Sequence, residues 1–301
     1  MPSVNRIAIL SPGDMGHAVG RALREHGKEV ITCLHGRSER TRELARRAGF
    51  EDVPDLEAVV TQADLILSIL PPAEARNLAR RVADALAATG AGTVFADCNA
   101  VSPRTTLEIG AMITSAGGRF VDVGIIGGPP SASQSPRLYA SGPYTDYVAA
   151  LDGMGILVRP MGDEIGRASS IKMCYAAMTK GTIALHTALL TAAELLGVAE
   201  ELREEFAEGH ADVYARMKAQ VPRVPAVSRR WSGEMEEIAA TFEQAGVTPH
   251  FHLGAAELYR MVGATPLADE TPEAVDPGRG MEDTIAVFAR AVVEHVSTSG
   301  R

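Results

Sequence analysis

An apolar segment, a glycine turn and a helix follow one another at the start of the chain, and this order constrains the fold most. The apolar segment is Arg6–Leu10, the turn holds Gly13 and Gly16, and a helical segment runs on to about residue 26. Glycines in such a turn let the backbone approach a pyrophosphate, whose charge the dipole and free N–H groups of the helix would hold. The segment predicts a dinucleotide-binding loop, although Ser11 stands where the fingerprint has its first glycine.

Short apolar strands alternate with helical segments through the first half of the chain. This alternation indicates a parallel sheet covered on both faces, and the glycine loop after the first strand favours the doubly wound, Rossmann-type α/β fold over residues 1–162. The predicted strands are 6–10, 29–34, 64–70, 93–97, 119–123, 138–142 and 156–159, with helices at 16–26, 39–48, 56–62, 73–88 and 103–115.

The pattern changes after residue 162, where the strands stop. Residues 167–196 contain no proline and one interior glycine, Gly181, and are apolar on all sides. A helix of roughly 30 residues would be about 45 Å long, and an all-apolar helix has to be buried, here between domains or between subunits. Residues 163–301 are therefore predicted to form an all-helical domain for substrate binding and dimerisation. Its further helices are 200–219, 231–245, 251–262 and 281–295, with an exposed loop at 265–280.

Charge and apolar content exclude several classes of function. A formal net charge of −9 argues against a nucleic-acid partner. The longest apolar stretch, Thr182–Leu196, is too short for a membrane span and is interrupted by His186 and Glu194. The first strand begins within a few residues of the N-terminus, which leaves no room for a signal peptide. We therefore expect no membrane partner.

Cysteine and histidine usage points to a cytoplasmic protein without a metal. Cys33, Cys98 and Cys174 are odd in number and scattered, which predicts reduced thiols in the core and a cytoplasmic location. His250 and His252 have no further ligand at metal spacing. We predict no metal site.

The segment after the second strand indicates which nicotinamide cofactor the loop would bind. NAD-binding proteins place an acidic residue there to accept from the ribose 2′-hydroxyl. This chain has instead Arg37, Ser38 and Arg40, and a guanidinium pairs well with a 2′-phosphate. The cluster favours NADP(H). The alternative is a solvated helix start with Ser38 as its N-cap.

Six segments with recognisable motifs follow one another over almost the whole chain. They are the loop Ser11-Pro12-Gly13-Asp14-Met15-Gly16, the turn Arg37-Ser38, the segment 63–71 ending in Leu70-Pro71, the turn 97–103 containing Asn99, the segment 122–128 ending in Ile126-Gly127-Gly128, and 162–172 ending in Lys172. In this order they resemble the 6-phosphogluconate dehydrogenase-like and β-hydroxyacid dehydrogenase superfamily. The resemblance implies that the loop, Leu70, Pro71 and Asn99 contact the cofactor, that 126–128 is the substrate loop, and that Lys172 is the catalytic lysine.

Departures from the family pattern bear on the substrate. Ile126 replaces the serine that binds a substrate carboxylate in the family, and Ala176 replaces its substrate asparagine. The segment 171–181 and the element Trp231-x-x-Glu234-Met resemble a poorly characterised branch of the superfamily. These changes weaken the case for a simple β-hydroxyacid.

The spacing of polar residues along the long helix supports an interpretation that is independent of the family resemblance. Lys172, Tyr175, Thr179 and His186 fall on one helical face. A polar stripe on a buried helix needs partners: either it bonds to a neighbouring loop or subunit, or it lines a cleft below the nicotinamide. In the second case Lys172 transfers a proton to or from the substrate oxygen, and Tyr175 assists or replaces it. Thr179 and Lys180 could contact substrate or lie on the helix surface, and His186 is read as a satisfied core histidine.

Residues 229–237 leave two interpretations open. Glu234–Glu237 resembles a family position that approaches the cofactor, or it forms the acidic first turn of a helix. Arg229 and Arg230 could pair with a cofactor phosphate or a substrate carboxylate.

Together these observations predict an NADP(H)-dependent oxidoreductase that acts on a small hydroxy or carbonyl compound. An imine reductase and a non-catalytic NADP-binding protein remain as alternatives. The resemblance also implies a homodimer formed through the helical domain.

Overall fold

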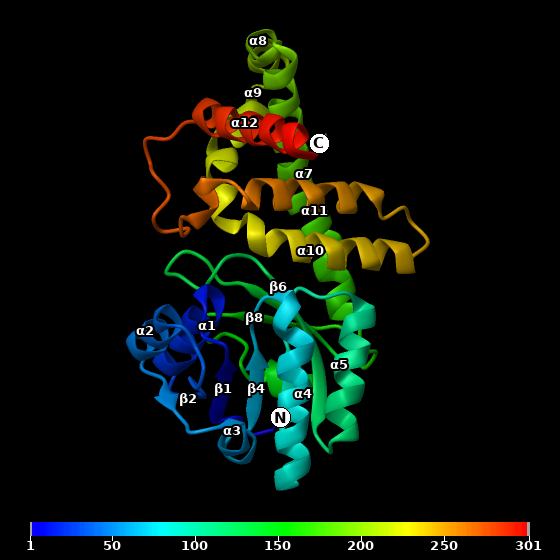
Figure 1. Cartoon of the computed structure of the whole chain (residues 1–301). Helices are drawn as coiled ribbons and strands as arrows, with labels where there is room; N and C mark the ends of the chain where they lie inside the picture. Colours follow the sequence, from blue (N-terminus) through cyan, green and yellow to red (C-terminus); the bar gives the residue numbers. More distant parts are fainter. Residues whose placement is uncertain (1, 300–301) are drawn as a thin grey trace. The chain divides into compact units, whose positions relative to one another are not determined.

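The computed structural model describes the backbone of residues 2–299 and the side chains of residues 2–294. The chain forms two compact units that divide between Tyr175 and Ala176. This division lies inside α7 (Arg167–Leu196), so the long helix belongs to both units (Figure 1). The sequence places the boundary before this helix, at residue 162.

The first unit is built on an eight-stranded sheet with the strand order β3-β2-β1-β4-β5-β6-β7-β8. The order reverses between β1 and β4, as expected for a doubly wound fold. One pairing departs from the predicted parallel sheet, because β6 and β7 are antiparallel. Only a loop joins these two strands, and a parallel pair would need a longer crossover. The strands are β1 (Arg6–Leu10), β2 (Glu29–Thr32), β3 (Glu51–Asp52), β4 (Leu65–Ser68), β5 (Val94–Asp97), β6 (Arg119–Ile126), β7 (Arg137–Ser141) and β8 (Leu157–Pro160).

Helices cover both faces of this sheet (Figure 1). Alternate residues of β1 point to opposite faces: Ala8 and Leu10 pack in one apolar cluster, Ile7 and Ile9 in the other. The first cluster includes residues of α3, α4 and α5, and the second includes residues of α1 and α6. The helices are α1 (Asp14–Glu25), α2 (Glu39–Ala48), α3 (Leu56–Gln62), α4 (Pro72–Thr89), α5 (Pro103–Ser115) and α6 (Thr145–Ala149).

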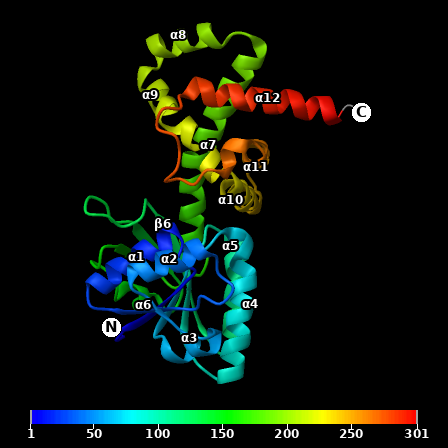
Figure 2. The same cartoon turned by 60° about the vertical axis from the view of Figure 1, so that its left-hand side comes forward.

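The second unit is helical, as predicted. Two of its helices, α10 and α11, pack side by side (Figure 2). Trp231 on α10 and Tyr259 on α11 meet edge to face, with ring centroids 5.4 Å apart. Besides its part of α7, the unit contains α8 (Ala199–Gly209), α9 (Ala211–Gln220), α10 (Pro225–Gln244), α11 (His250–Gly263) and α12 (Met281–Ser299), with the 3-10 turns Val221–Arg223 and Pro266–Asp269.

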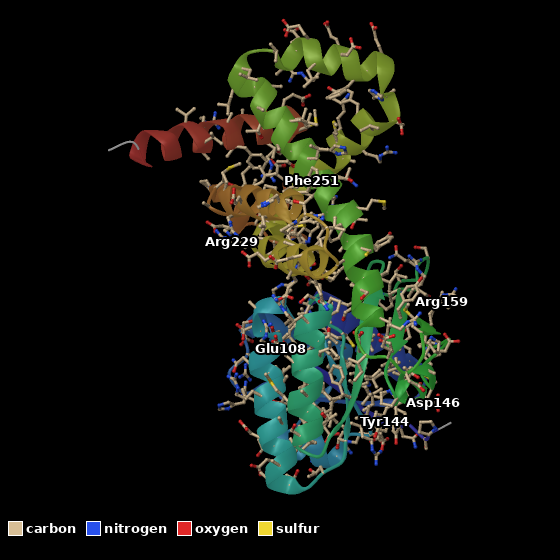
Figure 3. All side chains as sticks on the ribbon, turned by 90° about the vertical axis from the view of Figure 1, so that its right-hand side faces the viewer. Glu108, Tyr144, Asp146, Arg159, Arg229 and Phe251 are labelled. Carbon is tan, nitrogen blue, oxygen red and sulfur yellow. The ribbon has the colours of Figure 1, made fainter. Side chains whose placement is uncertain are left out.

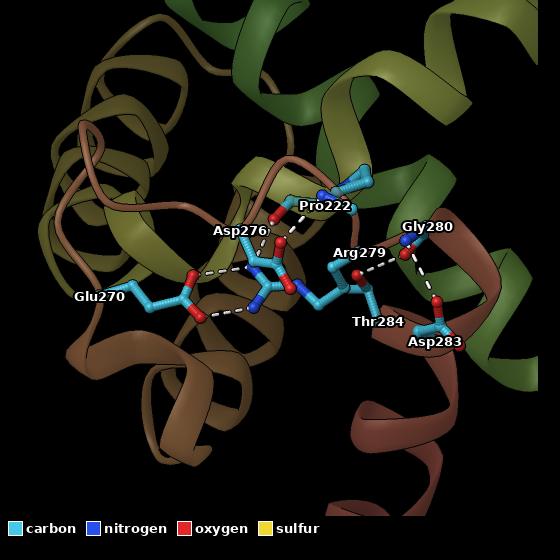
Figure 4. Close-up of polar contacts among 8 residues, drawn as sticks. Pro222, Glu270, Asp276, Arg279, Gly280, Asp283 and Thr284 are labelled. Carbon is cyan, nitrogen blue, oxygen red and sulfur yellow. Dashed lines mark hydrogen bonds and ion pairs between the residues drawn. The ribbon is translucent and has the colours of Figure 1, made fainter.

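The predicted loop 265–280 is more ordered than its composition indicates. It begins with a 3-10 turn, and its far end is held by Arg279 (Figure 4). The Arg279 guanidinium forms a bidentate pair with Glu270, with N–O distances of 2.5 and 2.8 Å, and donates to the carbonyl of Pro222 at 3.1 Å. The hydrogen bonds from Arg279 hold the pKa of Glu270 below its usual value. The loop is thereby fastened to itself and to the 3-10 turn Val221–Arg223.

One expectation about burial is wrong: Cys33 and Cys98 are buried free thiols, but Cys174, on α7, is exposed. Within a single chain α7 is not buried all round, since Met178 and Leu185 are each 62% exposed and Leu196 is 76% exposed. The expected burial of this helix between subunits stays a prediction. Within the described part of the chain, no helix combines the length and apolar content that crossing a bilayer requires.

Candidate cofactor and catalytic site

The glycine loop joins the end of β1 to the start of α1. Gly13 N–H donates to the carbonyl of Ser11 at 2.8 Å, which closes the turn without a glycine at position 11. A Cβ on Gly16 would lie 2.8 Å from the Ser11 carbonyl oxygen, so only glycine lets α1 approach the turn this closely. A Cβ on Gly13 would meet no described atom within 4 Å. The space beside Gly13 is therefore available to a ligand, as a pyrophosphate loop requires.

The remaining loop residues differ in accessibility. Pro12 and Gly16 are buried, Ser11, Gly13 and Met15 are half-buried, and Asp14 is exposed at the first position of α1.

The loops that follow β4 and β5 are tied together at one edge of the sheet. Asn99 is 3% exposed, and its Oδ1 accepts from the backbone N–H of Leu70 at 2.7 Å. Its Nδ2 donates to Ser68 Oγ at 3.1 Å and also to Asp97. The side-chain amide of Asn99 thus holds the Leu70-Pro71 turn in place. Parallel strands present their carboxyl ends at this edge, where dinucleotides bind in doubly wound folds.

The arginine cluster after β2 is present, and its members have different surroundings. Ser38 is the N-cap of α2, accepting from the N–H of Thr41 at 3.3 Å, as one of the two interpretations predicts. Arg37 is half-buried; burial lowers the pKa of its guanidinium, and the positive charge of Arg81 lowers it further. Arg40 pairs with Asp14 of the glycine loop at 2.5 Å. The N-cap role of Ser38 is compatible with phosphate binding, because this residue is exposed.

Lys172 lies in the first turns of α7, close to β6. Its Nζ donates to the carbonyl oxygen of Ile125 at 2.5 Å. The ammonium group is thereby held at the carboxyl end of β6, directly before the predicted substrate loop 126–128.

The other predicted substrate residues range from fully buried to exposed. Ile126 and Ala176 are 2% and 1% exposed, Gly127 is exposed and Gly128 is half-buried. Tyr175 is 41% exposed and Thr179 is half-buried, with its hydroxyl directed to the carbonyl of Ala176 at 3.4 Å. The four-residue polar stripe is therefore not uniformly buried.

His186 is buried, as predicted, but not satisfied. It is 6% exposed, and its Nδ1 has no hydrogen-bond partner among the described residues. Burial is the main cause that lowers its pKa, with a smaller contribution from Arg216.

Glu234 is neither solvated nor in a first helical turn, because α10 begins nine residues earlier, at Pro225. Its side chain is 3% exposed and pairs with Lys180 at 2.5 Å and with Arg230 at 2.7 Å. Lys180 also lies over the Trp231 ring, 5.8 Å from its centroid. This cluster joins α7 to α10, so Lys180 is not a surface residue.

Arg229, labelled on α10 in Figure 3, also has partners within the protein. It donates to the carbonyl of Gly263 at 2.9 Å and pairs with Asp269 at 2.7 Å. Both arginines that were candidates for a phosphate or substrate carboxylate are thus bound to acidic groups of this chain.

Gly124 and Asp122 were not singled out from the sequence. A Cβ on Gly124 would lie 2.5 Å from the carbonyl oxygen of Ala168 and 2.9 Å from the Cβ of Lys172, so this glycine lets α7 pack directly on β6. A glycine inside a strand marks a close backbone approach, and a carboxylate inside an apolar strand needs buried partners. Residues 119–126 contain both a glycine and an aspartate among apolar residues, so the sequence alone could have indicated this contact.

Residues 6–160 match the NAD binding domain of 6-phosphogluconate dehydrogenase. The chain belongs to this family. Residues 193–262 match a domain of unknown function, DUF1932. The family agrees with the sheet order, the glycine loop and the tied strand ends, and it supports a nicotinamide cofactor and an oxidoreductase.

Solved structures of three relatives share the fold. Conserved protein MTH1747, described as of unknown function and similar to 3-hydroxyacid dehydrogenases, is 28% identical, with a TM-score of 0.61 over 85% of this chain and 97% of that one. The 3-hydroxyisobutyrate dehydrogenase of Mycobacterium tuberculosis is 19% identical (TM-score 0.65; 91% and 98% covered). An imine reductase variant from Myxococcus stipitatus, solved with NAD+, is 19% identical (TM-score 0.53; 97% and 100% covered).

Proposed function

We propose that the protein is an NADP(H)-dependent oxidoreductase that acts on a small hydroxy or carbonyl compound, with Lys172 as general acid and base. The observation that carries this proposal is the position of the Lys172 ammonium, held by the Ile125 carbonyl at the carboxyl end of β6. The cofactor, when bound, donates or accepts the hydride. Its pyrophosphate would lie at the loop 11–16, where Gly13 leaves space.

The chain's own residues supply the proton chemistry. Lys172 delivers a proton to the substrate oxygen during reduction and removes it during oxidation. Tyr175, which is 41% exposed, is the second candidate proton donor. We assign substrate contacts to Gly127, Gly128 and Thr179, together with the apolar side chains of Ile126 and Ala176.

An imine is the second candidate substrate class. Ile126 and Ala176 offer no hydrogen-bonding side-chain group where the family binds a carboxylate, and both are almost fully buried. Without hydrogen-bonding side chains at these two positions, a cyclic imine or a ketone fits better than a hydroxyacid, because a desolvated carboxylate needs donors.

A screen of NADPH oxidation over hydroxyacid precursors, ketones, aldehydes and cyclic imines tests the proposal. We expect turnover with at least one class. Binding of NADPH without turnover of any class would instead support a non-catalytic NADP-binding protein.

The preference for NADP(H) gives a prediction at Arg37. Replacing Arg37 by alanine should weaken NADPH binding by about 10- to 100-fold, the value of one lost charge-assisted hydrogen bond pair. NADH has no 2′-phosphate, so its affinity should change little. Fluorescence titration with both cofactors measures this difference. Arg40→Ala should have a smaller effect, because Arg40 is already paired with Asp14.

Arg46→Ala provides the control for Arg37. Arg46 lies on α2, the helix that follows Arg37, is exposed and pairs with Glu43. Equal losses of NADPH and NADH affinity in Arg37→Ala would contradict recognition of the 2′-phosphate.

We also propose that a second copy of the chain packs on α7 to form a dimer. Within α7, Met178, Thr182, Leu185, Leu189, Ala192 and Leu196 repeat at alternating intervals of four and three residues. This is the spacing of a coiled-coil seam, it carries no charge, and most of it is exposed. We call these six residues the α7 seam. A self-complementary apolar seam suits a symmetric partner.

Replacing Leu185 by glutamate should convert the dimer to a monomer, because each copy would place a charge in the seam. Light scattering after size-exclusion chromatography measures the mass. Leu107→Glu is the control, since Leu107 lies on α5 and is 49% exposed. A monomeric wild-type protein would refute the dimer.

The cytoplasm is the proposed location, on the basis of the three free thiols.

A further inference from the structure

A buried carboxylate lies beneath the first turn of α7. Asp122, on β6, has no exposed surface, and four donors converge on it. Its Oδ2 accepts from Ser141 Oγ at 3.0 Å, from Gly166 N–H at 2.9 Å and from Ser169 N–H at 3.0 Å. Its Oδ1 accepts from Ser169 Oγ at 2.6 Å. Burial raises the pKa of this carboxyl group, and the hydrogen bonds oppose the rise.

Two hydroxyl groups extend this network. Ser141 Oγ accepts from the N–H of Ala168 at 3.1 Å, and Thr106 Oγ1 lies 2.7 Å from Ser169 Oγ. The first N–H groups of a helix have no partner within the helix, and an anion there also interacts well with the helix dipole. Here Asp122 of β6 and Ser141 of β7 supply the partners, and Thr106 of α5 bonds to the Ser169 hydroxyl. The sheet therefore fixes the start of α7.

Lys172 lies one turn beyond this network. It follows Ser169 by three residues and so shares its helical face. On that face Gly124 makes room for the Cβ of Lys172, and Ile125 accepts from its Nζ. Three residues of β6, namely Asp122, Gly124 and Ile125, thus contact successive residues of α7.

We propose that Asp122 is a positioning residue for Lys172. Its carboxylate fixes the first turn of α7, and this fixed turn sets where the Lys172 ammonium lies. The catalytic part of this inference, that the position of Lys172 matters for turnover, rests on the proposed function. The mechanical part, that Asp122 fixes the position of Lys172, does not.

Trace acetylation with acetic anhydride, read by mass spectrometry at each lysine, tests the mechanical part without a substrate. The chain has only four lysines: Lys28, Lys172, Lys180 and Lys218. In Asp122→Ala we expect Lys172 to react about fivefold or more faster than in the wild type, as a group released from a hydrogen bond does. The other three should react at unchanged rates. An unchanged rate at Lys172 would overturn the proposal.

Steady-state kinetics test the catalytic part with the substrate found in the NADPH screen. Asp122→Ala should lower kcat by about 100-fold, with NADPH affinity close to that of the wild type. Asp122→Asn should restore most of kcat, because its Oδ1 can accept from both backbone N–H groups while its amide donates to Ser169 Oγ. Ile113→Ala, a cavity variant in the core of α5, controls for stability alone and should keep kcat.

If Asp122→Ala does not fold, Ser169→Ala replaces it, since it removes the contact to Oδ1 and the link to Thr106. Wild-type kcat and wild-type acetylation of Lys172 in that variant would count against the proposal. Absence of turnover in the wild type would contradict only the proposed function, because the acetylation result stands by itself.

Discussion

Replacing Lys172 by alanine should lower kcat by about 10²- to 10⁴-fold, the range for loss of a positioned general acid. NADPH affinity should remain close to that of the wild type, because Lys172 is held at the end of β6 by Ile125 and the predicted pyrophosphate loop lies after β1. Single-turnover NADPH oxidation measures the chemical step, and fluorescence titration measures binding.

Lys218→Ala is the matched control for this variant. Lys218 lies on α9, with its Nζ 4.0 Å from the centroid of the Tyr214 ring, and it has no place in the proposed chemistry. Tyr175→Phe separates the two candidate proton donors: a loss of kcat as large as that in Lys172→Ala would make the tyrosine part of the mechanism. Unchanged turnover in Lys172→Ala would remove the lysine from it.

The doubly wound sheet could be predicted because its signals are local. Each strand is a short apolar run, and the loop 11–16 identifies the edge where a dinucleotide binds. The two-residue strand β3 was missed because Glu51 and Asp52 are polar and exposed. The antiparallel direction of β7 was missed because direction depends on the connection, and a loop of about ten residues resembles any other loop in the sequence.

The sequence could not predict which residues far apart in the chain contact one another in the site. Spacing along α7 indicates a shared face for Lys172 and Tyr175, but periodicity cannot identify Ile125 as the partner of the lysine. For the acidic run Glu234–Glu237 the sequence allows a position near the cofactor or the first turn of a helix, and the second interpretation is wrong because α10 already begins at Pro225. Its pairing with Lys180 joins residues 54 positions apart, which only the fold brings together.

The contact between β6 and α7 depends on the absence of one side chain. Gly124 does not have a positive φ, so its backbone conformation is open to other residues and only the space above it matters. That space is filled by the Ala168 carbonyl, which belongs to the helix backbone and cannot rotate away, and by the Cβ of Lys172. A larger residue at this position must push α7 off the sheet.

Gly124→Ala should therefore lower the free energy of unfolding by about 2–3 kcal/mol, as overpacking of a tight contact does, and lower Tm by roughly 5–10 °C. It should also reduce kcat, because a shift of α7 moves Lys172 away from Ile125. Thermal denaturation and NADPH oxidation measure the two effects. In the control Gly92→Ala, the new Cβ would have its nearest neighbours 3.9 Å away, so both quantities should stay near wild type. A wild-type Tm in Gly124→Ala would show that α7 moves away from β6 without loss of stability. It would contradict a fixed position of Lys172 on β6.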